Sequence, residues 1–513
     1  MRKFMTAFAA VVCCAVIALS SCEKNDSVQP KDQELPGGEA VFRFFKEINA
    51  IPRPSRHEEK MVEYLENFAK SNNLRYVIDG KNVIIYKDAT AGMEQLPMVT
   101  LQGHTDMVCV AADGYDVDFM TEGIKAVSDS TFIFSEDHKT SLGADDGIGL
   151  SIILAVLESS EISHGPLECL FTWDEETGFG GASSLTPGIL KGDYFFNIDS
   201  EAEGEMCIGT AGGALLDASL EYTSIPVPEG YAAFEVSVSG AAGGHSGIVI
   251  TNGGANAISV LADFLSTQVD DYYLASISGG QAVNIIALAA KAVVLVPEAG
   301  AIDFKDKLDS YAGAAKQRYA TTDPDLTFAI SAVDAPAECI SRDDTYAIVE
   351  GLAGTTQGVS EWSTAVDNMF EVSNNLGTVS VQDGVFMANC LIRGFESQKV
   401  VDLAEAITAA YDTVNTGFVC NAYNFFSSWN PDVNSPLITY ARNVYEQNFG
   451  KPLVLFKIGA GLELSEFALA YPDMQFITYG PTIYDAHSIN ERVEIKSVEK
   501  CWQYTLHLLR NIK

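Results

Sequence analysis

The chain has 513 residues, enough for several domains with large buried cores. Apolar residues make up 47% and charged residues 20%, a composition that excludes disordered, collagen-like and coiled-coil proteins. The 69 acidic and 32 basic residues give a formal net charge of −37. This charge argues against nucleic acid as a partner, because its phosphates would be repelled.

The N-terminal segment resembles a secretory signal. Two basic residues precede an apolar run over 4–19, and Cys22 follows a Ser-Ser pair. This run is shorter than the ~20 residues that a membrane-spanning helix needs. We therefore expect a signal peptide over 1–21, a flexible tether over 22–39, and export with a lipid on Cys22 as the contact with a bacterial membrane. The alternative is an ordinary cleaved signal with an incidental cysteine.

Seven cysteines lie beyond this segment, without any Cys-x-x-Cys pair. An odd and widely spaced set does not fit a disulfide framework or a thiolate zinc site. We expect most of these cysteines to be buried as small hydrophobic residues.

The next part of the chain alternates helical and strand patterns. A Ser start and spaced apolar residues predict an amphipathic helix over 55–73, and a second helix is expected over 147–160. Short, nearly continuous apolar runs predict buried strands. These runs lie at 76–87, 96–103, 167–173 and 193–199. The alternation predicts an α/β sheet with helices on both faces.

Polar residues follow these runs at the strand ends. His104 and Asp106 follow one run, Glu175 and Glu176 another, and Asp199 a third. Open α/β sheets build their sites at the carboxyl ends of strands. The sequence therefore predicts one site at this edge.

From residue 213 the pattern changes to strands of alternating polar and apolar residues with helices between them, which predicts an α+β module with an antiparallel sheet. After about 428 the buried-strand pattern returns. We therefore expect a catalytic domain over 40–212 and 429–513, interrupted by an inserted module over 213–428.

Two imidazoles and three carboxylates form the candidate metal-binding set, with His487 from the C-terminal segment. The five residues are His104, Asp145, Glu176, Asp199 and His487. With one shared carboxylate, they can hold two divalent metals that lower the pKa of a water and polarise an amide carbonyl. Glu175 is placed to act as the base, and Asp106 to orient His104. We interpret the remaining candidates His57, His138 and His164 as structural.

Eight motifs resemble those of a known family. They are LQGHTDMV, TSLGADDGIGL, FTWDEETGFGGA, NIDSEAEG, GGHSG, SNNLG, AGLE and GPTIYDAHSINER. In this order, from about 40 to 513, they are similar to the di-zinc metallopeptidases of the aminoacylase/carboxypeptidase type, and most of all to the peptidase D branch of aminoacylhistidine (Xaa-His) dipeptidases. The resemblance implies a zinc-peptidase-like α/β catalytic domain with a mixed, largely parallel sheet and an inserted α+β lid domain.

The resemblance also implies roles for individual residues. Asp145 would bridge the metals, with Glu176 and His487 on one and His104 and Asp199 on the other. Glu175 would be the general base. His245 would stabilise the oxyanion from the lid, while Asn284 and Arg393 would hold the substrate, Arg393 through its terminal carboxylate. The alternative for Arg393 is a surface salt bridge.

Three departures from the branch bear on the substrate. The run 284–288 lacks the usual arginine, Gly459 replaces the usual histidine before Ala-Gly-Leu-Glu, and Asp146 replaces the usual asparagine. We expect hydrolysis of Xaa-His or a broader set of dipeptides, with zinc first and manganese or cobalt as alternatives. Other readings are an amidohydrolase for N-acyl amino acids and a non-catalytic peptide-binding lipoprotein. A homodimer is kept open.

Overall fold

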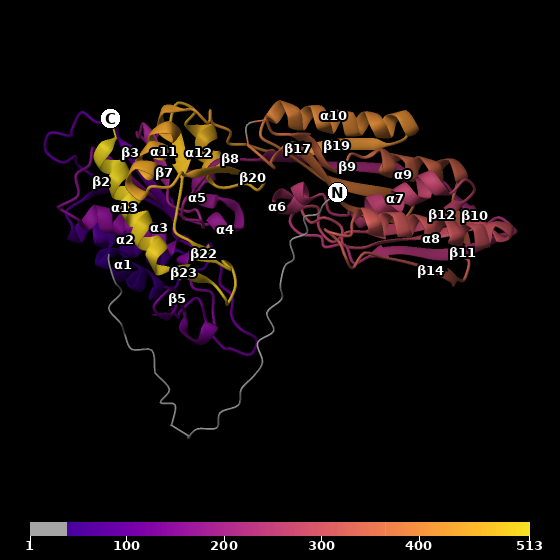
Figure 1. Cartoon of the computed structure of the whole chain (residues 1–513), viewed down its shortest axis with the longest axis horizontal. Coiled ribbons are helices and arrows are strands. Elements are labelled where there is room, and N and C mark those ends of the chain that lie inside the picture. Colours follow the sequence, from indigo (N-terminus) through magenta and orange to yellow (C-terminus); the bar gives the residue numbers. More distant parts are fainter. Residues whose placement is uncertain (1–37, 365, 513) are drawn as a thin grey trace, which may run out of the picture. The chain divides into compact units, whose positions relative to one another are not determined.

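The computed structural model describes residues 38–364 and 366–512. Most of its strands form two large sheets, and Figure 1 shows helices grouped around each of them. The strands of the first sheet come from the two ends of this range, and those of the second sheet come from its middle. The predicted fold class, an α/β domain with an inserted α+β module, is confirmed.

The first sheet has eight strands and is mixed. Four of its neighbouring pairs are parallel and three are antiparallel. Its strands in spatial order are β1 (Arg75–Asp79), β2 (Asn82–Lys87), β6 (Leu167–Thr172), β3 (Val99–His104), β7 (Tyr194–Asn197), β21 (Gln475–Thr478), β8 (Glu205–Thr210) and β20 (Val454–Ile458).

Both faces of the first sheet are covered. Val83 and Ile85 of β2 belong to one apolar core, while Ile84 between them belongs to a second core on the other face. This explains why the strand runs are continuously apolar, because a strand buried on both faces has no solvent-facing positions. The surrounding helices are α1 (Glu39–Asn49), α2 (Glu59–Ser71), α3 (Ala144–Glu158), α4 (Glu175–Gly178), α5 (Gly180–Ser184), α11 (Pro436–Phe449), α12 (Leu464–Ala470) and α13 (Ile495–Asn511).

The predicted helix 55–73 is present, but it begins later, at Glu59. Arg56 has a positive φ of 71° and its backbone N–H donates to Glu58 Oε1 at 2.6 Å, so a turn occupies the expected first helical turn. The expected strand 76–87 is likewise two strands, β1 and β2, joined through Gly80 at φ 64°.

A small four-stranded sheet is separate from the two large ones. It contains β4 (Ala126–Ser128), β5 (Phe132–Ser135), β22 (Ile483–Tyr484) and β23 (Arg492–Glu494).

The second sheet has nine strands, whose pairs are antiparallel as predicted. Its strands are β14 (Thr327–Val333), β11 (Tyr231–Ser239), β13 (Ala290–Pro297), β12 (Tyr273–Gly279), β17 (Phe370–Gln382), β18 (Val385–Gly394), β9 (Gly212–Glu221) and β19 (Val419–Phe426), with β16 (Gly358–Trp362) beside β17. Burial alternates along β9 and β11. This alternation fits a sheet with one face packed on a core.

Helices pack on the apolar core of the second sheet. They are α7 (Ala257–Gln268), α8 (Ala301–Arg318), α9 (Arg342–Gly354) and α10 (Ser397–Val414), with the short strands β10 (Ser224–Pro226) and β15 (Glu338–Ile340) nearby. The short helix α6 (Ser246–Val249) adjoins a separate, smaller apolar cluster. No single helix of the described ranges is long and apolar enough to cross a membrane, and one bent pair, Ser246–Asn252 with Ala257–Gln268, passes by length and composition.

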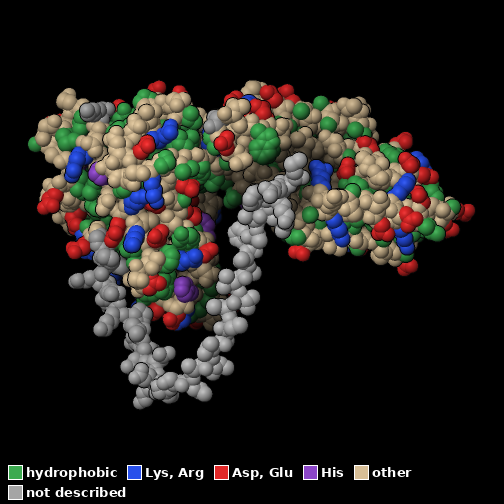
Figure 2. All heavy atoms as spheres, in the orientation of Figure 1, with side chains coloured by type: hydrophobic (Ala, Val, Ile, Leu, Met, Phe, Trp, Pro, Cys, Tyr) green, Lys and Arg blue, Asp and Glu red, His purple; other side chains and the backbone are tan. Residues whose placement is uncertain are grey.

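The seven cysteines of this part of the chain are free, and five of them are buried, as predicted. Acidic and basic side chains are interspersed on the face shown in Figure 2.

Candidate metal centre

The predicted site residues lie at the ends of parallel strands. His104 is the last residue of β3, Asp199 comes two residues after β7, and Glu176 lies in the short α4 that follows β6. Because β6, β3 and β7 pair in parallel, their carboxyl ends meet at one edge of the first sheet. Asp145 is added to this edge by the first turn of α3, where its backbone is not helical.

Asp145 lies between two imidazoles. Its Oδ1 is 3.0 Å from His104 Nε2, and its Oδ2 is 3.0 Å from His487 Nε2. Each imidazole also meets a second carboxylate, because His104 Nε2 is 3.4 Å from Asp199 and His487 Nε2 is 3.1 Å from Glu176. The five predicted ligands therefore form one chain of contacts with Asp145 at its centre.

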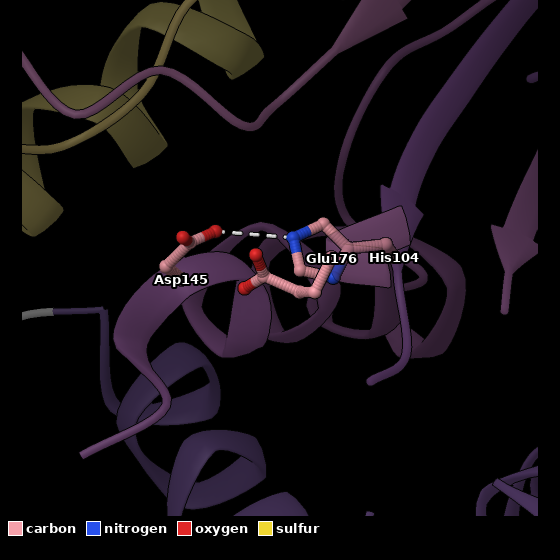
Figure 3. Close-up of side chains that lie close together, drawn as sticks. All are labelled: His104, Asp145 and Glu176. Carbon is pink, nitrogen blue, oxygen red and sulfur yellow. Dashed lines mark hydrogen bonds and ion pairs between the residues drawn. The ribbon is translucent and has the colours of Figure 1, made fainter. Parts of the chain in front are cut away.

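The donor set suits a divalent cation. Ligand atoms of His104, Asp145 and Glu176 lie within 4.8 Å of one another (Figure 3). Buried Glu176 Oε1 has no hydrogen-bond partner in the described part of the chain, and an unpaired buried polar atom is costly unless something binds it. Carboxylates and imidazoles are ligands that zinc and its neighbours accept.

The pKa shifts at this edge reflect the carboxylates gathered there and their burial. Burial alone would lower the pKa of His104, but Asp199, Asp106 and Asp145 outweigh it and raise the pKa well above its usual value. Hydrogen bonds to Asp145 and Glu176 raise the pKa of His487 to about 11, and burial raises the pKa of Asp199 to about 6. Divalent cations would supply the charge that protons supply in their absence.

Asp106 links a predicted ligand to the segment of the predicted base. Its carboxylate accepts the backbone N–H of Glu175 at 3.0 Å and of Glu176 at 3.3 Å. It lies 3.4 Å from His104 Nδ1, which is ion-pair distance but lacks the alignment of a hydrogen bond. Burial raises the pKa of Glu175 well above its usual value. A carboxylate so shifted is suited to accept a proton near neutral pH.

The three predicted lid residues lie on the second sheet or beside it. His245 forms a backbone bridge with Ile285, and Ser246 N donates to the carbonyl of Asn284 at 2.8 Å, so these segments are neighbours. The contacts described for this segment and for Arg393 do not reach the five predicted ligands.

Arg393 is only 7% exposed, and its Nη1 donates to the carbonyl of Gly459 at 3.1 Å. No carboxylate of the described residues lies within ion-pair distance of it, and burial lowers its pKa to about 10. The alternative reading of Arg393 as a surface salt bridge is therefore wrong. A buried guanidinium without a carboxylate is suited to an incoming anion.

The three histidines interpreted as structural lie apart from this set. His138 is exposed and stacks on Phe134, His57 is exposed, and buried His164 bonds the carbonyl of Gly165 at 2.7 Å.

Three further buried charged residues near the site were missed by the sequence reasoning: Arg53, Glu463 and Glu491. Thr172 Oγ1 donates to Glu463 at 3.1 Å, beside β3 and β6. Two of the three lie within motifs quoted above, AGLE and GPTIYDAHSINER, which is the signal that could have drawn attention to them.

Two relatives cover nearly the whole chain. A protein of Escherichia coli strain K12 named cytosol non-specific dipeptidase is 34% identical over 480 residues, which is 92% of this chain and 97% of the relative. The crystal structure of an aminoacylhistidine dipeptidase from Vibrio alginolyticus matches with a TM-score of 0.88 and 32% identity, covering 94% of this chain and 98% of that one. The predicted resemblance to the peptidase D branch is thereby confirmed.

The predicted location is contradicted. We expected export, a signal peptide and a lipid on Cys22, whereas the Escherichia coli relative is named a cytosol enzyme. A short apolar run behind basic residues satisfies the signal pattern by composition alone, and the pattern does not itself test location. The segments 1–21 and 22–37 lie outside the described residues.

The family itself follows from a match along most of the chain. The family model described as peptidase family M20/M25/M40 matches residues 100–511, a range that contains all five predicted ligands. The crystal structure of an aminopeptidase PepT from Bacillus cereus shares the fold, with a TM-score of 0.53 at 15% identity. The chain belongs to peptidase family M20/M25/M40.

Proposed function

We propose that this peptidase hydrolyses the peptide bond of dipeptides with two divalent cations held by the five clustered residues, zinc first and manganese or cobalt as alternatives. One observation carries the proposal. Asp145 offers one oxygen to each of two imidazoles, and each imidazole meets one further carboxylate. In this arrangement His104 and Asp199 would hold one cation and His487 and Glu176 the other, with Asp145 contributing to both. Both near-full-length relatives named above are called dipeptidases.

The cations and the residues around them have separate roles in the reaction. When bound, the cations supply positive charge that polarises the scissile carbonyl and lowers the pKa of a nearby water. Glu175 accepts the proton of the attacking water and returns it to the leaving amine. Asp106 holds the N–H groups of Glu175 and Glu176 and lies beside His104, so it fixes the base relative to a ligand.

The inserted module supplies the contacts to the rest of the substrate. Arg393 pairs with the terminal carboxylate of the dipeptide, since it is buried without a carboxylate of its own. His245 donates to the oxygen of the scissile carbonyl as negative charge develops there, and Asn284 on the neighbouring segment holds the substrate. We place the module at 213–428 between catalytic parts 40–212 and 429–513, since β8 ends at Thr210 and β9 begins at Gly212.

The dipeptide preference is broader than Xaa-His. A Cβ atom on Gly459 would lie 2.1 Å from the carbonyl oxygen of Gly247 and 2.6 Å from the ring of Phe370. The histidine usual in the peptidase D branch therefore has no room here, and the run 284–288 lacks an arginine. The name of the Escherichia coli relative, non-specific, agrees with this breadth. The comparisons do not favour the readings as an N-acyl amidohydrolase or a non-catalytic binder, and a homodimer stays a prediction.

The experiment that tests this function is Glu175→Gln in the metal-loaded protein, with Glu122→Gln, an exposed residue of the same part of the chain, as the matched control. We expect Glu175→Gln to bind the same amount of metal by elemental analysis and to lose about 10²–10⁴-fold in kcat on a dipeptide panel, because general-base catalysis is worth that much. The control should match the wild type in both. A normal rate for Glu175→Gln would reject the base. An N-acyl amino acid hydrolysed faster than every dipeptide would reject the substrate class.

A further inference from the structure

Glu491 binds the loop that leads into Asp145. Glu491 is 2% exposed, and its carboxylate accepts four successive backbone N–H groups, those of 142–145, at 2.7, 3.0, 2.7 and 3.4 Å. It lies four residues after His487, on the segment that carries this ligand. No basic side chain of the described ranges is within ion-pair distance of Glu491, so its charge is satisfied by the backbone of this loop.

Arg53 binds the same loop from another direction. It is 1% exposed, and its guanidinium donates to the carbonyl of Gly143 through Nη2 and to the carbonyl of Asp106 through Nη1 at 2.6 Å. Gly143 is thus held at its N–H by Glu491 and at its carbonyl by Arg53. A Cβ atom at Gly143 would lie 2.5 Å from Arg53 Nη2, and its φ is 70°, so this position requires glycine.

We propose that Glu491 and Arg53 form a positioning clamp that sets where Asp145 stands between the two imidazoles. The local helix does not set this position, because Asp145 has φ −82° and ψ 114° at the start of α3. The N–H groups that precede a helix have no intrahelical partner, and here a side chain from the His487 segment accepts them. The clamp ties the segments of three ligands, His104, Asp145 and His487, to one another. It rests on the proposed metal site and assigns positioning roles to two residues that do not themselves bind metal.

Cobalt binding to the metal-free full chain tests the clamp without turnover. Co²⁺ absorbs in the visible range according to its ligand geometry, and competition with a chelator gives its affinity. The variant is Glu491→Gln. The matched control is Glu168→Gln, because Glu168 is also fully buried and accepts backbone N–H groups, of Lys191 and Gly192 at 3.1 and 3.2 Å, from a loop without ligands.

We expect Glu491→Gln to bind Co²⁺ about 10–100-fold more weakly than the wild type with a changed absorption band, as for other residues that orient metal ligands. Glu168→Gln should keep the wild-type affinity and band, even where both variants lower the unfolding temperature of the chelated protein. If Glu491→Gln does not fold, Glu491→Asp, whose side chain is one methylene shorter, takes its place with the same expectations.

Two results would overturn the inference in different ways. Wild-type affinity and band in the Glu491 variant would reject the clamp while leaving the metal site in place. Absence of any Co²⁺ band in the wild type would reject the proposed function, and the clamp with it.

Discussion

The two large sheets bury charge to different extents. In the described part of the inserted module, over 213–428, the buried charged residues are three: Asp323, Glu371 and Arg393. Around the first sheet they include His104, Asp106, Asp146, Glu463 and Glu491, gathered near one strand edge. Burying a charge is costly unless a partner offsets it. Both sheets pack on apolar cores. Around the first sheet, backbone donors offset part of the buried charge and the proposed cations would offset more of it.

The largest expected effect compares two aspartates, half-buried Asp145 near the first sheet and buried Asp323 near the second. Asp145→Asn removes the charge shared by the two imidazoles, and we expect metal to be lost and kcat/KM to fall at least about 10³-fold, since metal assistance is worth several kcal/mol. Asp323 is 2% exposed and accepts the N–H groups of Ala242 and Ala255 at 2.7 and 2.8 Å. Asp323→Asn should lower the unfolding free energy by about 1–3 kcal/mol.

Elemental analysis, dipeptide kinetics and denaturant unfolding of both variants measure this contrast. Asp323→Asn should keep the wild-type metal content. Equal loss of metal in the two variants would contradict the distinction between the sheets.

Much of the first sheet and its site could be predicted because the signals are local. Continuous apolar runs mark strands buried on both faces, and the residues after them must lie at the strand ends. His104 and Asp199 were found in this way. The start of α2 at Glu59 was missed because the turn at Arg56 is stabilised by Glu58, which no periodicity records.

Long-range contacts explain the other misses. Glu491 meets the loop 142–144 across more than 340 residues of chain, and a single sequence carries no sign of such a pairing. The predicted export failed for a different reason, because an apolar N-terminal run gives composition and not location.

A smaller effect is expected at Arg393, the buried cation of the second sheet. Arg393→Lys removes the planar fork that pairs with a carboxylate, and we expect kcat/KM for dipeptides to fall about 10–100-fold, since a hydrogen bond to a charged group is worth about 1.5–3 kcal/mol. The loss should appear mainly in KM. Arg342→Lys is the matched control, at a half-buried arginine of the inserted module that pairs with Asp271, and its kcat/KM should match that of the wild type.

Dipeptide amides sharpen this test. If Arg393 binds the terminal carboxylate, wild type and Arg393→Lys should hydrolyse an amidated dipeptide at similar rates, because the group that distinguishes them is gone. If the rate of Arg393→Lys falls equally for the dipeptide and for its amide, Arg393 does not bind the terminal carboxylate.

The smallest effect concerns the loss of stability in acid, and we expect a residue near the first sheet, His164, to contribute to it. Burial lowers the pKa of His164, whose ring bonds the carbonyl of Gly165. The unfolded chain takes up a proton near pH 6.5, while the folded state resists it, so the unfolded state binds more protons below that pH. This contribution to stability is present above about pH 6.5 and is lost as the pH falls, by up to about 1.4 kcal/mol per pH unit.

Denaturant unfolding at pH 7.5 and 5.5 measures this loss. In His164→Gln the difference in unfolding free energy between the two pH values should shrink, by up to about 1 kcal/mol. His138→Gln, at an exposed ring stacked on Phe134, should keep the full wild-type difference. An unchanged difference in His164→Gln would assign the acid sensitivity to other groups. Each variant loses one histidine, but only His164 is buried. The comparison therefore separates the free-energy cost of charging a buried imidazole from the effect of losing a histidine.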